Sequence, residues 1–88
     1  MDMFQLECVL AVAQYRSFTK ASESKHISQP ALSQIIAKVE QELGVKLFDR
    51  STRYVYLTTP GQEFIQHALR IQQEYHTAWE NMQKYQNI

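Results

Sequence analysis

The sequence predicts a mainly α fold of four helices, with a single β-hairpin before the last of them. Glycine and proline account for only 2 residues each among 88, too few for the many turns of an all-β sandwich. Apolar residues recur at helical spacing over most of the chain, whereas residues 45–58 are rich in β-branched and aromatic side chains. A chain of this length forms one small domain with room for one projecting element.

The first two helices are expected within residues 1–25. One buried stripe of the first helix follows the i, i+3, i+4, i+7 spacing: Leu6, Val9, Leu10 and Ala13. Asp2 suits its N-terminal end, where the helix dipole favours negative charge, and the pattern fades at residues 15–16. Ser17 is a good N-cap for a short second helix over residues 18–25. That helix places Phe18, Ala21 and Ser22 toward the core and breaks at residues 26–27.

The third helix has the clearest boundaries in the sequence. Ser28 is a strong N-cap candidate, Pro30 suits the first turn, and Gly44 suits a left-handed C-terminal cap. Its apolar positions recur at steps of four, three and four: Leu32, Ile36, Val39 and Leu43. The opposite side is expected to carry Ser33, Gln34, Ala37, Lys38 and Gln41.

Residues 45–48 and 55–58 are expected to form the two strands of a hairpin around the loop 49–54. The final helix is expected to begin with Thr59 as N-cap, Pro60 at N1 and Gln62 at N3 in a capping box. From there the apolar positions alternate by four and three in a heptad seam: Phe64, Ala68, Ile71, Tyr75, Ala78, Met82 and Tyr85, with Trp79 on one flank.

The length of this last helix predicts a partner. At 1.5 Å per residue it would extend about 40 Å, longer than a small domain is wide. Its distal half, residues 75–85, therefore needs a second protein surface, because a free stripe of large apolar residues invites aggregation. The aromatic residues fit an antiparallel homodimer better than a tight parallel zipper, with all eight seam residues as its interface.

Charge is distributed unevenly although 9 basic and 9 acidic residues cancel overall. Residues 16–53 hold seven basic residues against four acidic ones, a net charge of +3, while both flanking segments are acidic. Basic charge around a helix-turn-helix is the usual electrostatic footprint of a DNA-binding protein. The middle of the chain is therefore the candidate nucleic-acid interface.

Three helices followed by a hairpin are the element order of a winged helix-turn-helix, whose second helix of the turn enters the major groove of DNA. The residues exposed at the start of that helix are Ser28, Gln29, Pro30, Ala31, Ser33 and Gln34. Gln29 can pair with adenine, and Pro30 or Ala31 can touch a thymine methyl. Lys38 can reach the DNA backbone one turn further on. Arg50 and Arg53 occupy the wing, where an Arg can enter a narrow minor groove; Asp49 or Glu42 are alternative partners for Arg50.

Four sequence blocks carry a family resemblance: SFTKA at 17–21, HISQPALSQ at 26–34, LGVKLFDR at 43–50 and LTTPG at 57–61. In order and spacing they resemble the N-terminal DNA-binding domain of LysR-type transcriptional regulators, over about residues 3–66. The resemblance implies a bacterial, cytoplasmic regulator that binds double-stranded DNA as a dimer at an inverted repeat. By position, the residues proposed above match the recognition helix and the wing of the family.

The resemblance also implies a division of the chain. Residues 1–58 correspond to the winged helix-turn-helix and residues 59–88 to the linker helix that pairs two subunits. The effector-binding domain of full-length members is absent from this chain, and a small-molecule effector is expected only for that domain.

Four positions depart from the family. Lys25 replaces a common core Leu, and Arg16 stands where Gly or Asn often ends the first helix. Val39 replaces a common Leu conservatively, and Ile35 replaces a commonly polar residue, which removes one possible DNA-facing group. The stem of Lys25 can cover the core while its ammonium reaches water or phosphate.

Other classes of protein find little support. A single cysteine, Cys8, fits a reducing compartment, and with the three histidines it makes no metal-ligand spacing, so neither a metal nor a cofactor is expected. No catalytic motif indicates an enzyme, and no apolar run approaches the roughly 20 residues of a membrane span. The class-level alternative is a protein-interaction module, which would not need Lys38 and the wing arginines beside Ser28-Gln29-Pro30.

Overall fold

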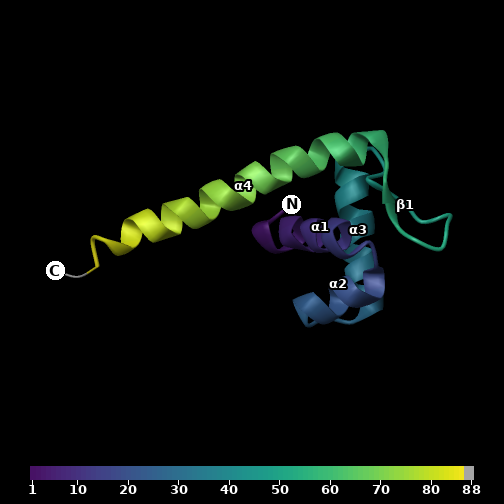
Figure 1. The fold of residues 1–88 in the computed structure, drawn as a ribbon, viewed down its shortest axis with the longest axis horizontal. Helices are drawn as coiled ribbons and strands as arrows, with labels where there is room; N and C mark the ends of the chain where they lie inside the picture. Colours follow the sequence, from purple (N-terminus) through teal and green to yellow (C-terminus); the bar gives the residue numbers. More distant parts are fainter. Residues whose placement is uncertain (87–88) are drawn as a thin grey trace.

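The computed structural model describes residues 1–86 and shows a small helical body from which one long helix projects (Figure 1). The elements are α1 (Met3–Tyr15), α2 (Phe18–Lys25), α3 (Gln29–Leu43), β1 (Phe48–Asp49), β2 (Tyr56–Leu57) and α4 (Thr59–Gln83). Helices α1, α2 and α3 pack together, the hairpin lies at one side, and α4 crosses α1 and continues past it. The predicted order of three helices, wing and long helix is confirmed.

Side-chain caps fix the start of the first three helices. The Asp2 carboxylate accepts from the Gln5 backbone N–H, and the Gln5 side chain accepts from the N–H of Asp2, which completes a capping box. Ser17 accepts from the N–H of Lys20, and Ser28 accepts from the N–H of Ala31. Each cap satisfies a donor that the first turn leaves free and is worth about 1 kcal/mol.

The same three helices end in the left-handed conformation. Gly44 takes it with φ 76°, as its lack of a Cβ permits, and Arg16 and His26 take it with φ 50° and 58°. A non-glycine residue there costs roughly 1–2 kcal/mol. The sharp turn at Arg16 brings α2 back against α1, so the strained position directs the chain into the helix-turn-helix.

The core lies where α1, α2, α3 and the base of the hairpin meet. Fully buried side chains from these elements include Val9, Val12, Leu32, Ile36, Val39 and Leu47. Phe18 of α2 and Phe48 of β1 add an edge-to-face aromatic pair with ring centroids 6.4 Å apart. The predicted stripe of α3 is confirmed except at its end, because Leu43 faces solvent beyond the last turn that packs on the core.

The hairpin is shorter than the sequence predicts. Only two residue pairs form a ladder, Phe48 with Leu57 and Asp49 with Tyr56. Residues 45–47 lie outside the strand. The buried Glu40 carboxylate, rather than a partner strand, accepts from the N–H of Leu47 at 2.7 Å and from the N–H of Phe48 at 3.3 Å. This contact fixes how the chain enters the wing.

The start of α4 differs from its predicted capping box by one residue. Thr58, rather than Thr59, is the N-cap and accepts from the N–H of Gly61, so Gln62 lies outside the cap. The helix passes so close to Leu47 that a Cβ on Gly61 would overlap the Leu47 carbonyl oxygen. Gly61 is therefore required for close packing, a role that its spacing in the sequence did not indicate.

The predicted seam of α4 divides into two parts. Ala68 is 0% exposed and packs with Leu6 and Leu10 of α1, with Phe64 beside them, so these two positions belong to the domain's own core. Beyond that point the remaining seam residues are exposed: Ile71, Tyr75, Ala78, Trp79, Met82 and Tyr85. Helix α4 ends at Gln83, so Tyr85 lies in the turn that follows, and residues 87–88 of the predicted linker lie outside the described residues.

Candidate DNA interface

The N-terminal end of α3 projects from the body together with the start of α2. Ser28, Gln29 and Pro30 in the first turn are exposed, as are Gln34 and Lys38 one and two turns later. Ala31 and Ser33 are half-buried, and Ser33 lies toward the wing, where its hydroxyl meets Arg50. The predicted recognition residues therefore share one accessible surface, at the helix end whose free N–H groups and dipole favour an anion.

Gln29 is held by a neighbour on α2. The hydroxyl of Thr19 donates to Oε1 of Gln29 at 3.2 Å. The contact occupies the amide oxygen of Gln29, so that the amide N–H₂ can still donate, and it reduces the freedom that this side chain would lose on binding. Thr19 was not among the predicted site residues, because the link depends on how α2 crosses α3.

The two wing arginines occupy different surroundings. The guanidinium carbon of Arg50 lies 3.7 Å from the ring centroid of Phe18, and its Nη2 donates to the Ser33 hydroxyl at 3.5 Å. Neither alternative acidic partner is used within the described residues: Asp49 is bonded to Ser51, and Glu42 is bonded to the N-terminal amine. Hydrogen bonds from Ser51 lower the pKa of the Asp49 carboxyl below its ordinary value. Arg53, in contrast, is exposed in the loop, with its guanidinium carbon 5.8 Å from the ring centroid of Tyr54.

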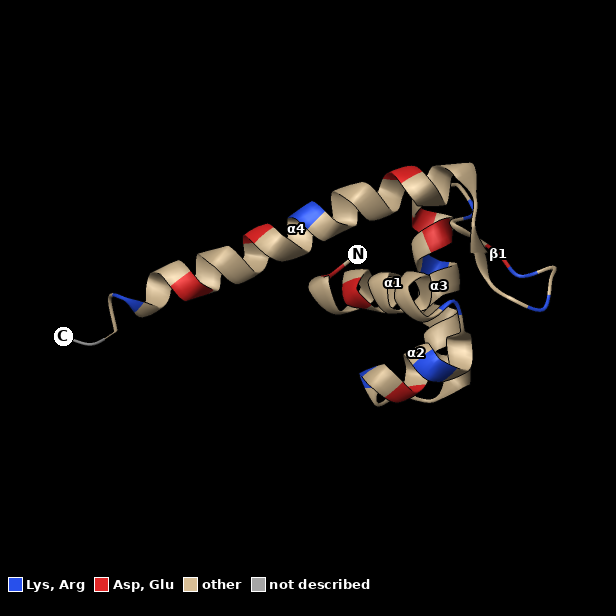
Figure 2. Ribbon diagram, viewed as in Figure 1, with Lys and Arg blue, Asp and Glu red and all other residues tan. Residues whose placement is uncertain are grey.

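A groove joins the α2 start, the α3 start and the wing. Its charged lining residues are all basic: Arg16, Lys20, Arg50 and Arg53. Gln29, Thr19 and Tyr54 also line it. Figure 2 shows these basic segments on α2 and the wing, away from the acidic residues of α4. Arg16 and Lys20 were missed as site residues, although both belong to the basic middle segment; only the fold places them beside Gln29.

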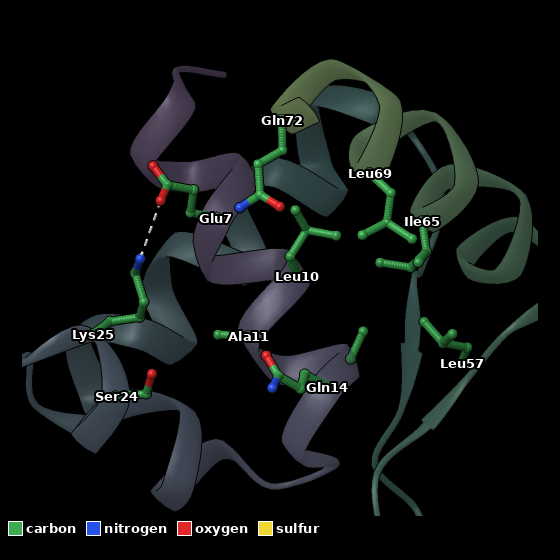
Figure 3. Close-up of a pocket in the computed structure, with 11 residues that line it drawn as sticks. Glu7, Leu10, Ala11, Gln14, Ser24, Lys25, Leu57, Ile65, Leu69 and Gln72 are labelled. Carbon is green, nitrogen blue, oxygen red and sulfur yellow. Dashed lines mark hydrogen bonds and ion pairs between the residues drawn. The ribbon is translucent and has the colours of Figure 1, made fainter. Parts of the chain in front are cut away.

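Lys25 lies outside this groove. Its ammonium pairs with the Glu7 carboxylate at 3.5 Å and lies 5.6 Å from the Phe4 ring centroid, so it bridges α2 and α1. Figure 3 shows this pair at the edge of a second groove, between α1 and α4, which Leu10, Ile65 and Leu69 also line. Lys25 is half-buried, and its charged end meets Glu7 instead of the predicted water or phosphate.

The described residues contain no cluster of three His, Cys, Asp or Glu side chains placed to hold a metal ion. Within the same part of the chain, no helix has the length and apolarity needed to cross a bilayer. Cys8 is buried, and burial raises the pKa of its thiol above the ordinary value.

A sequence model described as "Bacterial regulatory helix-turn-helix protein, lysR family" matches residues 3–62. The chain therefore belongs to the LysR family of bacterial regulatory helix-turn-helix proteins, and its winged helix-turn-helix is the family's DNA-binding domain. One relative, the HTH-type transcriptional regulator YcgK of Bacillus subtilis (strain 168), is 50% identical over 68 residues. That match covers 77% of this chain and 21% of the relative, so the chain spans about a fifth of that protein.

Two solved structures of DNA complexes share the fold. The BenM_DBD complex with catB site 1 DNA has a TM-score of 0.96 at 32% identity and covers 100% of this chain and 99% of that one. The CbnR_DBD–DNA complex has a TM-score of 0.91 at 30% identity, with coverages of 99% and 100%. The relatives are transcriptional regulators rather than enzymes, which agrees with the absence of catalytic motifs.

Proposed function

We propose that this chain reads a DNA operator by placing the N-terminal end of α3 in the major groove and the wing at the adjacent minor groove. The observation that carries the proposal is the groove that joins the two elements, because all its charged lining residues are basic. Duplex DNA is the partner whose phosphates match such a surface. The similar fold of the BenM_DBD and CbnR_DBD complexes with DNA also supports duplex DNA as the partner. A protein-interaction module would not require a basic groove at this place.

The residues divide by the kind of contact each can make. Gln29 and Gln34 have amides suited to base edges, and Pro30 and Ala31 can meet a thymine methyl. Ser28, Ser33 and Lys38 suit phosphate: Ser28 lies at the dipole end of α3, Ser33 provides a hydroxyl donor, and Lys38 provides a positive charge further along the helix. Arg53 is the wing residue best placed for the minor groove, because it is exposed and has no acidic partner among the described residues.

The second half of the proposal is a homodimer formed through α4. Tyr75, Trp79 and Met82 are 43%, 60% and 55% exposed on a helix that extends beyond its own domain. Large apolar side chains in a continuous stripe are unusual on a monomer. Pairing two such helices antiparallel would place two α3 helices at successive major grooves, and so predicts an inverted-repeat site.

In the full-length protein, we propose a cytoplasmic regulator whose small-molecule effector binds a further domain. The support is the length of the relatives, since this chain spans only a fifth of YcgK.

Base recognition is tested by Gln29→Ala, with Gln41→Ala as the matched control on the distal part of α3. Loss of the amide is expected to weaken binding to a selected operator by roughly 1–3 kcal/mol and to relax base preference at one position per half-site. Gln41 is exposed and distant from the groove, so its variant should bind as the unmodified chain does. Equal losses on operator and scrambled DNA would contradict base contact by Gln29.

The dimer is tested by Tyr75→Glu combined with Met82→Glu. Charges that the dimer would bury in the seam are expected to give monomers in light scattering. DNA binding is then expected to be much weaker, because the contact with the second half-site is no longer intramolecular. Gln66→Glu with Gln73→Glu adds the same charge at exposed polar positions and should leave the dimer intact. A dimeric seam variant would refute α4 as the interface.

A further inference from the structure

Arg50 connects three elements of the fold. It follows β1 directly, and its guanidinium lies over Phe18 at the start of α2, 3.7 Å from the ring centroid. From there Nη2 reaches the Ser33 hydroxyl on α3 at 3.5 Å. Phe18 itself is only 4% exposed, and its ring also packs edge-to-face with Phe48 of β1. The cation therefore covers the edge of the core as well as joining the wing to α3.

The Glu40 carboxylate of α3 holds the base of the wing through the N–H groups of Leu47 and Phe48, whereas fewer polar contacts hold the outer part of the wing, residues 50–55. Beyond that base the hairpin ladder has two residue pairs, and the Val55 N–H makes a long bond to the Arg16 carbonyl, at 3.5 Å. The loop between the strands is held mainly by its own short-range bonds, such as those of Asp49 with Ser51. The direction of the outer part of the wing relative to α3 thus depends on the Arg50 side chain, which links it to Ser33 and Phe18.

The chemistry of the contact requires arginine. A planar guanidinium can lie flat on an aromatic face and still donate in its own plane to Ser33. A lysine ammonium is a hydrated point charge and cannot do both. By accepting from Arg50, the Ser33 oxygen also leaves its own hydrogen free to donate outward, toward the surface proposed to meet DNA.

We infer that Arg50 is a positioning residue, which sets the angle between the wing and α3 and orients the Ser33 hydroxyl. This inference rests on the proposed function, since it assigns the two wing arginines different roles in DNA binding. Arg53 contacts DNA directly, and Arg50 acts through Phe18 and Ser33.

The test compares Arg50→Ala and Arg50→Lys with Arg53→Ala and Arg53→Lys, each measured for operator affinity over a range of salt concentration. Each lost phosphate contact lowers the magnitude of the slope of log K against log salt by about 0.9, and so by about 1.8 for a dimer that loses one contact in each subunit. Arg53→Ala is expected to show that reduction, and Arg53→Lys to restore both slope and affinity. Arg50→Ala is expected to bind roughly tenfold more weakly with less than half of that slope change, and Arg50→Lys to restore little. Restoration by Lys at position 50, or a full slope change in Arg50→Ala, would overturn the inference.

A second measurement on the DNA-free chain separates this inference from the proposed function. Backbone amide relaxation of residues 51–54 is expected to show a more mobile wing in Arg50→Ala and Arg50→Lys and an unchanged wing in Arg53→Ala. Thermal unfolding of each variant confirms that the body remains folded. An unchanged wing in both Arg50 variants refutes the positioning role whatever the DNA result. Failure of the unmodified chain to select any DNA refutes the proposed function, while the relaxation result still decides the role of Arg50.

Discussion

Replacing Glu40 with alanine is expected to destabilise the domain by about 3 kcal/mol, although the residue touches no proposed site. Its carboxylate is buried and accepts from two backbone N–H groups, those of Leu47 and Phe48, at 2.7 and 3.3 Å. Hydrogen bonds to a charged group contribute about 1.5–3 kcal/mol each, and the longer bond belongs at the lower end. The nearby Lys46 adds little, because its side chain is 79% exposed and its nitrogen is 3.9 Å from the carboxylate.

The assay is unfolding followed by circular dichroism, at two protein concentrations because a dimer would couple stability to concentration. A loss of about 3 kcal/mol corresponds to a fall in Tm of about 12–24 °C for a domain of this size. Glu40→Gln keeps one acceptor oxygen and should lose about half as much. Glu42→Ala is the matched control: its exposed bond to the N-terminal amine should change stability by under about 1 kcal/mol. If Glu40→Ala lost less than about 1 kcal/mol, or Glu42→Ala lost as much as Glu40→Ala, the assigned anchor would be wrong.

Three further outcomes follow from the packing. Gly61→Ala should lose about 1–3 kcal/mol in urea unfolding despite the higher helix propensity of alanine, because the new Cβ overlaps the Leu47 carbonyl; a more stable variant would contradict the close approach. The Cys8 thiol should stay protonated at neutral pH and react with a disulfide reagent only on unfolding, since burial raises its pKa and keeps it from solvent; fast reaction of the native chain would argue against this burial. Lys25→Met should leave DNA affinity and its salt slope unchanged, because the ammonium pairs with Glu7; a slope reduced in magnitude by about 0.9 per subunit would place Lys25 on phosphate.

Much of the fold could be predicted because its signals are local. The caps Ser17 and Ser28, the left-handed Gly44 and the apolar spacing of α1 and α3 act within a few residues, and the structure contains each of them. The cap of α4 was misplaced by one residue because Thr58 and Thr59 are equivalent candidates in the sequence. In the structure Thr58 is the one fixed by a distant part of the chain, since its N–H donates to the Leu47 carbonyl at 3.0 Å.

The remaining differences depend on contacts between distant parts of the chain. The first strand was predicted too long because nothing in the sequence shows that Glu40 would bind the N–H groups of residues 47–48. A heptad pattern likewise cannot show that α1 covers Ala68 and leaves Ile71 free. Arg16 and Lys20 join the proposed site for the same reason, since only the crossing of α2 over α3 brings them to Gln29.

The most direct test of DNA recognition is selection of genomic fragments by the purified chain at two salt concentrations. Enrichment of a shared inverted repeat that survives the higher salt is the predicted result, and it would identify the operator and the two-fold mode of binding together. Specific contacts survive salt better than backbone attraction alone, which weakens steeply as salt rises. Enrichment without a common motif, lost at the higher salt, would contradict the account that α3 and the wing of this chain read sequence.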